Sequence, residues 1–281
     1  MPQLTVQGAT IEYRVLGPDD SPHPPVVFVH GILVDHRLWL DAAETLADNG
    51  FRCILPDLPL GSHTIPVPAS VPLTPQTVAE MVHDLIGALE LHDVTLVGND
   101  TGGGLCQLLV DAHPEDVGRL ILTNCDAFDK FPPFPFNVVF ATMRGPKSMR
   151  LLSQLMRVTA VRHSPLGYGL LLARSQNEAL TASWVTPMST DPRIARNLAA
   201  LLRAVAAMDL TDVATRLPRF TKPVTLVWGM ADRCFTPALG RRLAALFPDA
   251  EMVEVPGART FVALEKPSAV VDAVARVGTR R

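Results

Sequence analysis

The chain has 281 residues, and its 25 Lys and Arg against 28 Asp and Glu give a formal net charge of −3. That length predicts one large domain, or a core with an insertion, and a hydrophobic content of 48% with only 19% charged residues excludes a disordered chain. The balanced charge lacks the basic excess typical of nucleic-acid-binding domains, so we expect no nucleic-acid partner.

Strand and helix patterns alternate along most of the chain, after a stretch at residues 4–16 that predicts an antiparallel hairpin. Short apolar runs predict buried parallel strands at residues 25–29, 52–55, 94–97, 119–123, 224–228 and 251–255. Helical periodicity appears between them, at residues 35–49, 74–89, 101–112, 238–247 and 268–277. This alternation predicts an α/β fold with a mostly parallel sheet, covered by helices on both faces.

Residues 126–218, called the insert below, interrupt the alternation. The segment begins with phenylalanines interspersed with prolines (Phe128, Phe131, Phe134, Phe136 and Phe140) and continues with helical runs such as 149–158 and 194–208. Its net charge is +5, whereas the remainder carries −8. Because it follows one predicted strand and precedes another, we expect a helical cap over the carboxyl ends of the strands, where ligands bind in open α/β sheets. Residues 1–125 and 219–281 would then form the core.

Cysteines and apolar runs bear on metals and membranes. The cysteines at positions 53, 106, 125 and 234 lack metal-site spacing and lie mostly in apolar runs, so we expect free, buried thiols and no metal. The N-terminal residues resemble no secretion signal. The longest uncharged run, residues 58–79, contains five prolines, which exclude a membrane helix there. We therefore expect a cytoplasmic protein without a membrane partner.

The most informative motif is Gly-Asn-Asp-Thr-Gly-Gly-Gly at residues 98–104, between a predicted strand and a predicted helix. A sharp strand-to-helix turn strains its central residue and leaves no room for side chains beside it, which accounts for the glycines at 98, 102 and 103. The segment fits neither common glycine-rich phosphate-binding pattern. We interpret it as a nucleophile elbow with Asp100 at its centre.

Together with this elbow, three segments make the chain resemble the α/β-hydrolase superfamily over nearly its whole length: His-Gly at 30–31, Trp-Gly-Met-Ala-Asp at 228–232, and residues 257–267 near the C-terminus. The resemblance implies an α/β-hydrolase fold. It also implies an oxyanion hole formed by the N–H groups of Ile32 and Thr101, and a triad acid at Asp232. In the third segment, Thr260 stands where the superfamily has its catalytic histidine.

An aspartate at the elbow resembles the branch that contains haloalkane and fluoroacetate dehalogenases and epoxide hydrolases. In that branch the carboxylate forms an alkyl ester, and a histidine then activates water to cleave it. Two subfamily signatures are missing, because Thr101 stands where haloalkane dehalogenases usually have Trp, and Leu33 where epoxide hydrolases typically have Pro.

The missing histidine leaves three interpretations open. Another histidine could act as the base: His36, His63 or His163. Alternatively, Asp100 acts as a general acid or base in an addition, elimination, cyclisation or isomerisation, with one pKa raised by burial and by Asp232. In the third interpretation the pocket only binds a ligand, as in plant hormone receptors on this fold that have lost the same histidine.

Further residues are predicted to line a pocket for a small, largely apolar substrate, without a cofactor: His30, Trp39, Asn124, Phe128, Tyr168 and Thr260. Asn124 ends the strand before the insert, where some dehalogenases hold an alternative triad acid, and Asp126 and Asp129 are nearby. Trp39 and the phenylalanines at 128–140 could equally serve only in packing.

Overall fold

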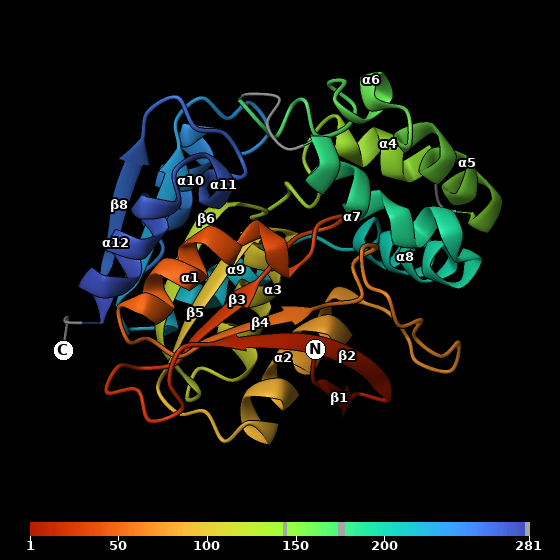
Figure 1. Ribbon diagram of the computed structural model, residues 1–281. Coiled ribbons are helices and arrows are strands. Elements are labelled where there is room, and N and C mark those ends of the chain that lie inside the picture. The colour runs from red at the N-terminus through yellow and green to blue at the C-terminus, as the bar shows by residue number, and fades with distance from the viewer. Residues whose placement is uncertain (143–144, 174–177, 279–281) are drawn as a thin grey trace.

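The computed structural model describes residues 1–142, 145–173 and 178–278 (Figure 1). Within them, one eight-stranded sheet has the order β1-β2-β4-β3-β5-β6-β7-β8. From β4 to β8 the neighbouring strands are parallel, whereas β1 and β2 form the predicted antiparallel hairpin. The strands are β1 Gln3–Val6, β2 Ala9–Leu16, β3 Val26–Val29, β4 Cys53–Asp57, β5 Val94–Asp100, β6 Val117–Cys125, β7 Val224–Gly229 and β8 Ala250–Val255.

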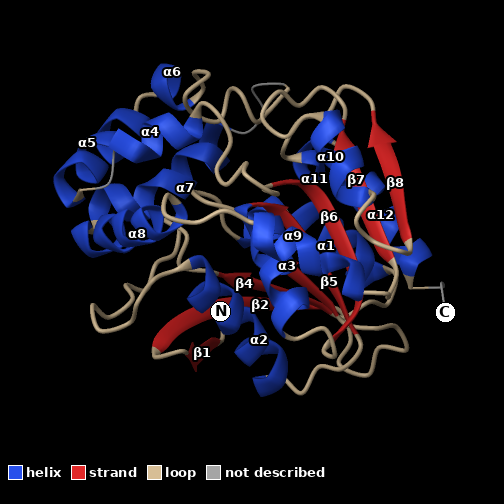
Figure 2. Cartoon of the chain, turned by 180° about the vertical axis from the view of Figure 1, so that it is seen from behind, coloured by secondary structure: helices blue, strands red, loops and turns tan. Residues whose placement is uncertain are grey.

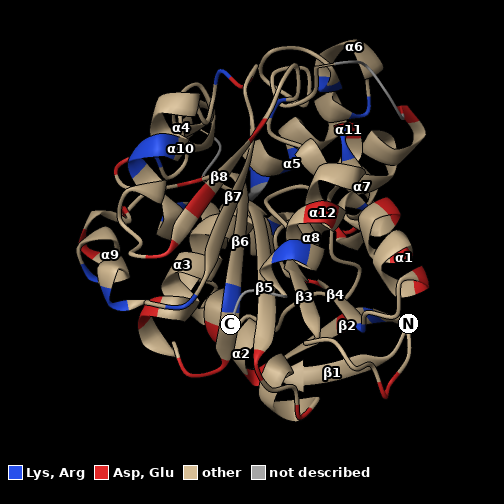
Figure 3. Cartoon of the chain, turned by 90° about the vertical axis from the view of Figure 1, so that its left-hand side faces the viewer, with Lys and Arg blue, Asp and Glu red and all other residues tan. Residues whose placement is uncertain are grey.

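Helices cover both faces of the sheet, which confirms the predicted α/β architecture. Seen along its edge, the sheet has α2, α3, α9 and α10 on one side and α1 and α12 on the other, and charged residues lie mainly on the surrounding helices and loops (Figure 3). These helices are α1 Leu40–Asp48, α2 Pro75–Ala88, α3 Thr101–Ala112, α9 Thr211–Arg216, α10 Pro237–Ala244 and α12 Pro267–Val277, and the short α11 Val262–Glu265 precedes α12.

Local signals explain where these helices begin. The Thr74 hydroxyl accepts a hydrogen bond from the Thr77 N–H, and Pro75 occupies the first turn of α2, as expected for a capped helix start. The single helix predicted over residues 35–49 was wrong at its start. Asp35 caps a separate 3₁₀ turn, His36–Leu38, and α1 begins only at Leu40.

The helices of the insert lie together beyond the carboxyl ends of the strands (Figures 1 and 2). They are α4 Phe136–Thr142, α5 Pro146–Met156, α6 Thr159–Arg162, α7 Glu178–Thr190 and α8 Pro192–Val205. Helix α5 packs against α7 and α8, whereas α9 returns to the core and contacts α3. The division into core and cap at residues 126 and 218 stays a prediction.

The interior is apolar and contains all four cysteines. Each is a free thiol and buried, as predicted. Burial raises the pKa of the Cys53 thiol to about 12, so it remains protonated. In the described part of the chain, no helix combines the length and apolarity needed to cross a bilayer.

Candidate active site

The predicted elbow is a strained junction between β5 and α3. Asp100 joins the two elements with φ 54° and ψ −130°, a conformation that non-glycine residues seldom adopt. A Cβ at Gly102 would lie 2.2 Å from the Val29 carbonyl oxygen, and one at Gly103 would lie 2.3 Å from the Cβ of Cys125. The turn is therefore compatible only with glycine at these positions.

Asp100 lies against the turn that follows β3. A Cβ built on Gly31 would come within 2.5 Å of Asp100 Oδ2, so the carboxyl group occupies the space that a side chain at position 31 would need. Ile32 and Thr101, whose N–H groups were predicted to form an oxyanion hole, line the same cavity as Asp100. The structure thus brings these three predicted site residues together.

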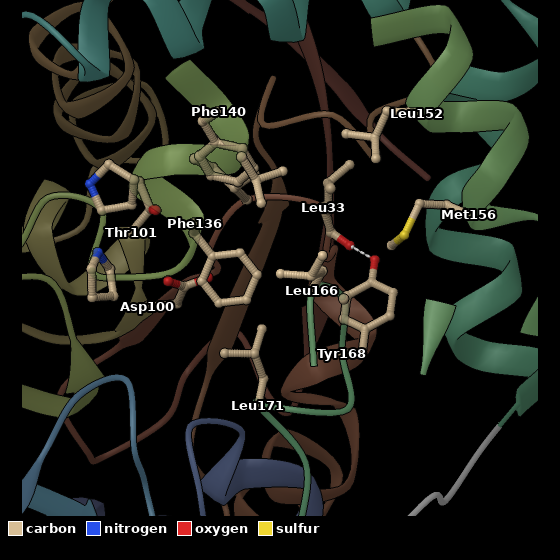
Figure 4. Close-up of a pocket in the computed structure, with 15 residues that line it drawn as sticks. Leu33, Asp100, Thr101, Phe136, Phe140, Leu152, Met156, Leu166, Tyr168 and Leu171 are labelled. Atoms are coloured by element: carbon tan, nitrogen blue, oxygen red, sulfur yellow. Dashed lines mark hydrogen bonds between the residues drawn. The ribbon is translucent and has the colours of Figure 1, made fainter. Parts of the chain in front are cut away.

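That cavity is largely apolar, and its empty space, counting the part that is open to solvent, is about 590 Å³ (Figure 4). The turn after β3 and the elbow form one wall, and the insert forms the rest, with Phe136, Val139, Phe140, Leu152, Met156, Leu166 and Leu171. Tyr168 also lines it, but its hydroxyl donates a hydrogen bond to the Leu33 carbonyl. Among the described lining residues, Asp100 carries the only carboxyl group.

Asp232 lies just after β7 and is saturated with hydrogen-bond donors. Its Oδ1 accepts from the N–H groups of Cys234 at 2.7 Å and Phe235 at 3.1 Å. Its Oδ2 accepts from Asn124 Nδ2 at 2.9 Å and from the Thr260 hydroxyl at 2.8 Å. Burial raises the pKa of Asp232 to about 6, although the four hydrogen bonds oppose this shift.

Thr260 is fully buried, and both its side-chain hydroxyl and its backbone carbonyl make hydrogen bonds. While its hydroxyl donates to Asp232, its carbonyl oxygen accepts from Asn99 Nδ2 at 2.7 Å. Asn124 is held in the same way, since its Oδ1 accepts from the Gly229 N–H at 2.6 Å. Sequence analysis missed Asn99, because its position beside Asp100 gives no sign of what its side chain contacts.

Asp126 is the unexpected member of this group. Its N–H donates to the Asp100 carbonyl at 3.3 Å, and its side chain is completely buried. Neither carboxyl oxygen has a hydrogen-bond partner of ordinary geometry among the residues that the structure describes. Such a group is costly to ionise. Burial, and then the charge of Asp100, raise the pKa of Asp126 well above its usual range, and the Thr101 hydroxyl opposes this only in part.

Asp100 is affected in the same direction. Burial raises the pKa of Asp100 to about 7, the Thr101 N–H opposes the shift, and the charge of Asp232 adds to it. Asp100 ends β5 and Asp126 follows the neighbouring strand β6, and the pKa of each carboxyl group is raised. At neutral pH the Asp100–Asp126 pair retains at least part of a proton.

The histidines lie elsewhere. All eight are within the described residues, and none lines the cavity or bonds to Asp232. His36 Nδ1 contacts Asp57 at 2.9 Å, and His163 Nε2 contacts the Thr181 hydroxyl at 2.9 Å. His63 accepts from the Gly61 N–H, and burial lowers its pKa to about 4.

Several predicted pocket residues do not reach the cavity. His30 accepts from the Leu58 N–H and contacts the Gly31 carbonyl, so both ring nitrogens are used. Trp39 is fully buried beside Phe28. The Arg242 guanidinium lies over the Phe128 ring, with its Cζ 3.7 Å from the ring centre. Asn124 and Thr260 face Asp232 instead. Of the six predicted pocket residues, only Tyr168 lines the cavity.

Within the described part of the chain, side chains that could bind a metal gather in two places, both outside the cavity. Glu80, His83 and His113 form one cluster, and Asp35, His36 and Asp57 form the other. The rings of His83 and His113 are stacked, with centroids 3.7 Å apart, so their in-plane nitrogens do not converge on one point. Hydrogen bonds already occupy His36, Asp57 and Asp35. Neither arrangement is set for a metal ion.

Comparison with known proteins agrees with the fold and the order of the motifs. Residues 24–267 match the family described as the alpha/beta hydrolase fold. Haloalkane dehalogenase 2 of Mycobacterium tuberculosis is 25% identical over 268 residues, which cover 91% of this chain and 88% of that one. Cis-3-alkyl-4-alkyloxetan-2-one decarboxylase of Xanthomonas campestris is 25% identical over 287 residues, covering 95% and 91%.

The solved structures agree with this match. A putative ancestral haloalkane dehalogenase superimposes with a TM-score of 0.79 at 20% identity, covering the whole of both chains. The family match includes both the elbow and Asp232 and spans most of the chain. This protein belongs to the α/β-hydrolase fold family, and its relatives named here are enzymes.

Proposed function

We propose that the protein is an enzyme that acts on a small apolar molecule, with Asp100 exchanging a proton with the substrate. Reactions of this class include elimination, isomerisation and cyclisation, in which a carboxyl group donates a proton at one atom and its carboxylate accepts one from another. No cofactor is required for such a step. The Asp-nucleophile origin of the site and the substitution of a histidine by Thr260 are parts of this proposal.

The observation that carries the proposal is that Asp232 accepts a hydrogen bond from the Thr260 hydroxyl. In a hydrolytic triad the acid orients an imidazole. Here the Thr260 hydroxyl makes the 2.8 Å contact, and Asn124 and two backbone N–H groups take up the remaining acceptor positions. A threonine hydroxyl cannot act as a base near neutral pH, so the second half of a hydrolytic cycle lacks its base.

The protonation of Asp100 supports the same chemistry. A general acid or base works best when its pKa is near the operating pH, and burial raises the pKa of Asp100 to about 7. The neighbouring Asp126 carboxyl is buried without a hydrogen-bond partner of ordinary geometry among the described residues, and it resists a second negative charge beside it. Asp100 can thus be present in both the acid and the base form at neutral pH.

The cavity wall supports an apolar substrate. Its lining from the described part of the insert is mainly Leu, Met, Val and Phe, and the Tyr168 hydroxyl there already donates a hydrogen bond to the Leu33 carbonyl. Apart from Asp100, the polar groups on this wall are the backbone of the turn at Ile32 and Thr101, whose N–H and hydroxyl also act on the carboxyl groups of Asp100 and Asp126. Donors at these positions suit a developing negative charge on a carbonyl or leaving group.

A second candidate is nucleophilic attack by Asp100 at an sp³ carbon. The strained elbow and the dehalogenase relatives favour it. Without a base, however, the resulting alkyl ester would turn over more slowly by roughly 10²–10⁴-fold, the usual contribution of general-base help. This candidate therefore predicts a trapped ester on Asp100.

One experiment separates the two candidates. The purified protein is incubated with primary alkyl halides, epoxides, activated esters and unsaturated ketones, and each mixture is analysed for product and, by intact-protein mass spectrometry, for adducts. Proton-transfer chemistry predicts product without an adduct, and no product with Asp100→Asn. Nucleophilic attack predicts an adduct that Asp100→Asn prevents and that Thr260→His releases.

Two further outcomes would overturn the proposal. If Asp100→Asn left the turnover of a confirmed substrate unchanged, the reactive group would lie elsewhere. If a tightly bound molecule were recovered chemically unaltered from the wild type after long incubation, and no compound were turned over, the protein would be a ligand-binding member of the family.

A further inference from the structure

Exposed apolar side chains are concentrated in one part of the molecule. Apart from Met1, every large hydrophobic residue that is exposed in the described chain lies between positions 134 and 166: Phe134, Val138, Leu151, Leu155, Val158 and Leu166. Their exposed fractions range from 43% to 71%. Scattered apolar residues are normal on a surface, but a concentration of this kind indicates an interaction site.

Helix α5 has two apolar faces. On its inner side, Leu152 and Met156 line the cavity (Figure 4). Leu151 and Leu155, which are four residues apart in the helix, and Val158, two residues after its end, are exposed on a different side. Burial against α7 and α8 accounts for the inner face only, and no described residue covers the outer one.

The charge of this region is entirely positive. Residues 131–177 contain six Lys and Arg and no Asp or Glu, in a chain whose net charge is −3. Lys147, Arg150 and Arg157 are exposed and alternate with the exposed apolar residues in and just after α5. We call these three residues, with Leu151, Leu155 and Val158, the outer face. Basic residues interleaved with leucines are typical of helices that lie on anionic lipid.

We propose that the outer face docks on an anionic lipid bilayer. A second copy of the chain is a poor partner, since a two-fold dimer through this face would bring like charges together. Nucleic acid would pair with the basic residues but would leave the exposed leucines in water. The inference departs from our expectation of no membrane partner, which rested on the absence of a spanning helix. Docking at the surface needs none, and it does not depend on the reaction proposed above.

The test is co-sedimentation of the full-length protein with vesicles. One set is phosphatidylcholine, and the other is phosphatidylcholine mixed with phosphatidylglycerol. A charge variant combines Lys147→Gln, Arg150→Gln and Arg157→Gln, and an apolar variant combines Leu151→Ser, Leu155→Ser and Val158→Ser. A matched control removes three exposed basic residues of the core, with Arg219→Gln, Arg241→Gln and Lys266→Gln. Circular dichroism and thermal unfolding verify that each variant is folded.

We expect the wild type and the core control to bind the anionic vesicles and not the neutral ones. Because each basic residue near an anionic surface strengthens binding by about fivefold, the charge variant should bind at least tenfold more weakly. The apolar variant should also lose binding, by a similar factor. Failure of the wild type to bind would overturn the proposal, as would equal losses in the charge variant and the core control. Undiminished binding by the apolar variant would overturn it too. The exposed leucines would then contribute nothing to binding, and an acidic macromolecule would fit the basic residues as well as a bilayer does.

Discussion

The two ends of the candidate site treat a buried carboxyl group in opposite ways. Asp232 receives four hydrogen bonds, whereas Asp126, beside Asp100, receives none of ordinary geometry among the described residues. Donors stabilise the charged form of a carboxyl group, and their absence favours the neutral one. The comparison suggests that the Asp232 end is built to hold a charge in place, and the Asp100 end to keep a proton available.

The largest effect is expected from Asp100→Asn, which tests whether Asp100 supplies the exchangeable proton. Removing the proton-exchanging group should lower turnover by about 10²–10⁴-fold, the usual contribution of general acid–base help. For the wild type, activity that requires the acid form should fall as the pH rises through about 7, because Asp100 then loses its proton. Both results are measured as kcat against pH for a confirmed substrate. Activity that rises through pH 7 would instead indicate that the carboxylate is the required form.

Thr260→Val tests the Asp232 end. The substitution preserves shape but removes the hydroxyl that donates to Asp232 Oδ2. Hydrogen bonds to charged groups contribute about 1.5–3 kcal/mol, so the free energy of unfolding at pH 8 should fall by about 2 kcal/mol. Thr260→Ser, which keeps the donor, serves as the control in urea-induced unfolding. An unchanged free energy of unfolding in Thr260→Val would mean that the hydroxyl does not stabilise the fold, and a loss confined to Thr260→Ser would assign the effect to the methyl group.

Asp126→Asn tests the Asp100 end. A carboxyl group whose pKa is raised on folding binds more protons in the native state, so stability falls as the pH rises from the unfolded pKa, near 4, through the folded one. The variant cannot ionise, so its stability should decline less between pH 5 and pH 9. We expect it to exceed the wild type by on the order of 1–2 kcal/mol at alkaline pH and to differ little at pH 5. Parallel pH profiles of unfolding would contradict this account.

The smallest expected effect concerns Tyr168, which joins the insert to the turn after β3. Tyr168→Phe removes the hydrogen bond to the Leu33 carbonyl while keeping the ring in the cavity wall. A hydrogen bond between neutral groups contributes about 1 kcal/mol, so the thermal midpoint should fall by a few degrees. Tyr13→Phe, at a half-buried position of β2, is a matched control for loss of a hydroxyl. A larger fall for the control would rule out a special role for Tyr168.

Local patterns predicted much of the fold. Apolar runs located the parallel strands, and the glycines at 98, 102 and 103 predicted the turn that places Asp100. Glycine spacing is informative because it reports close backbone approach directly. The start of the predicted 35–49 helix was wrong, because the side-chain contacts of Asp35 with Arg37 and Trp184 are not visible in the sequence.

The candidate site was less predictable for a related reason. The order of the motifs predicted that Ile32, Asp100 and Thr101 share one site, and all three line one cavity. It could not predict which neighbouring polar side chains are in contact. Asn99 bonds to Thr260 across 161 positions, and Asn124 bonds to Asp232 across 108. Such partners depend on how strands align in three dimensions. That Asp126 has no hydrogen-bond partner of ordinary geometry among the described residues is a property of packing, which no local pattern encodes.

The contact between Gly31 and Asp100 ties the identities of two positions together. A methyl group at position 31 would lie 2.5 Å from Asp100 Oδ2, so Ala can enter there only if the side chain at 100 is shortened or moves. The constraint runs in one direction: a smaller residue at 100 leaves room at position 31, whereas a larger residue at 31 requires the Asp100 side chain to be shortened or to move. A variant of this protein that keeps the reactive carboxyl in place must therefore keep glycine at position 31.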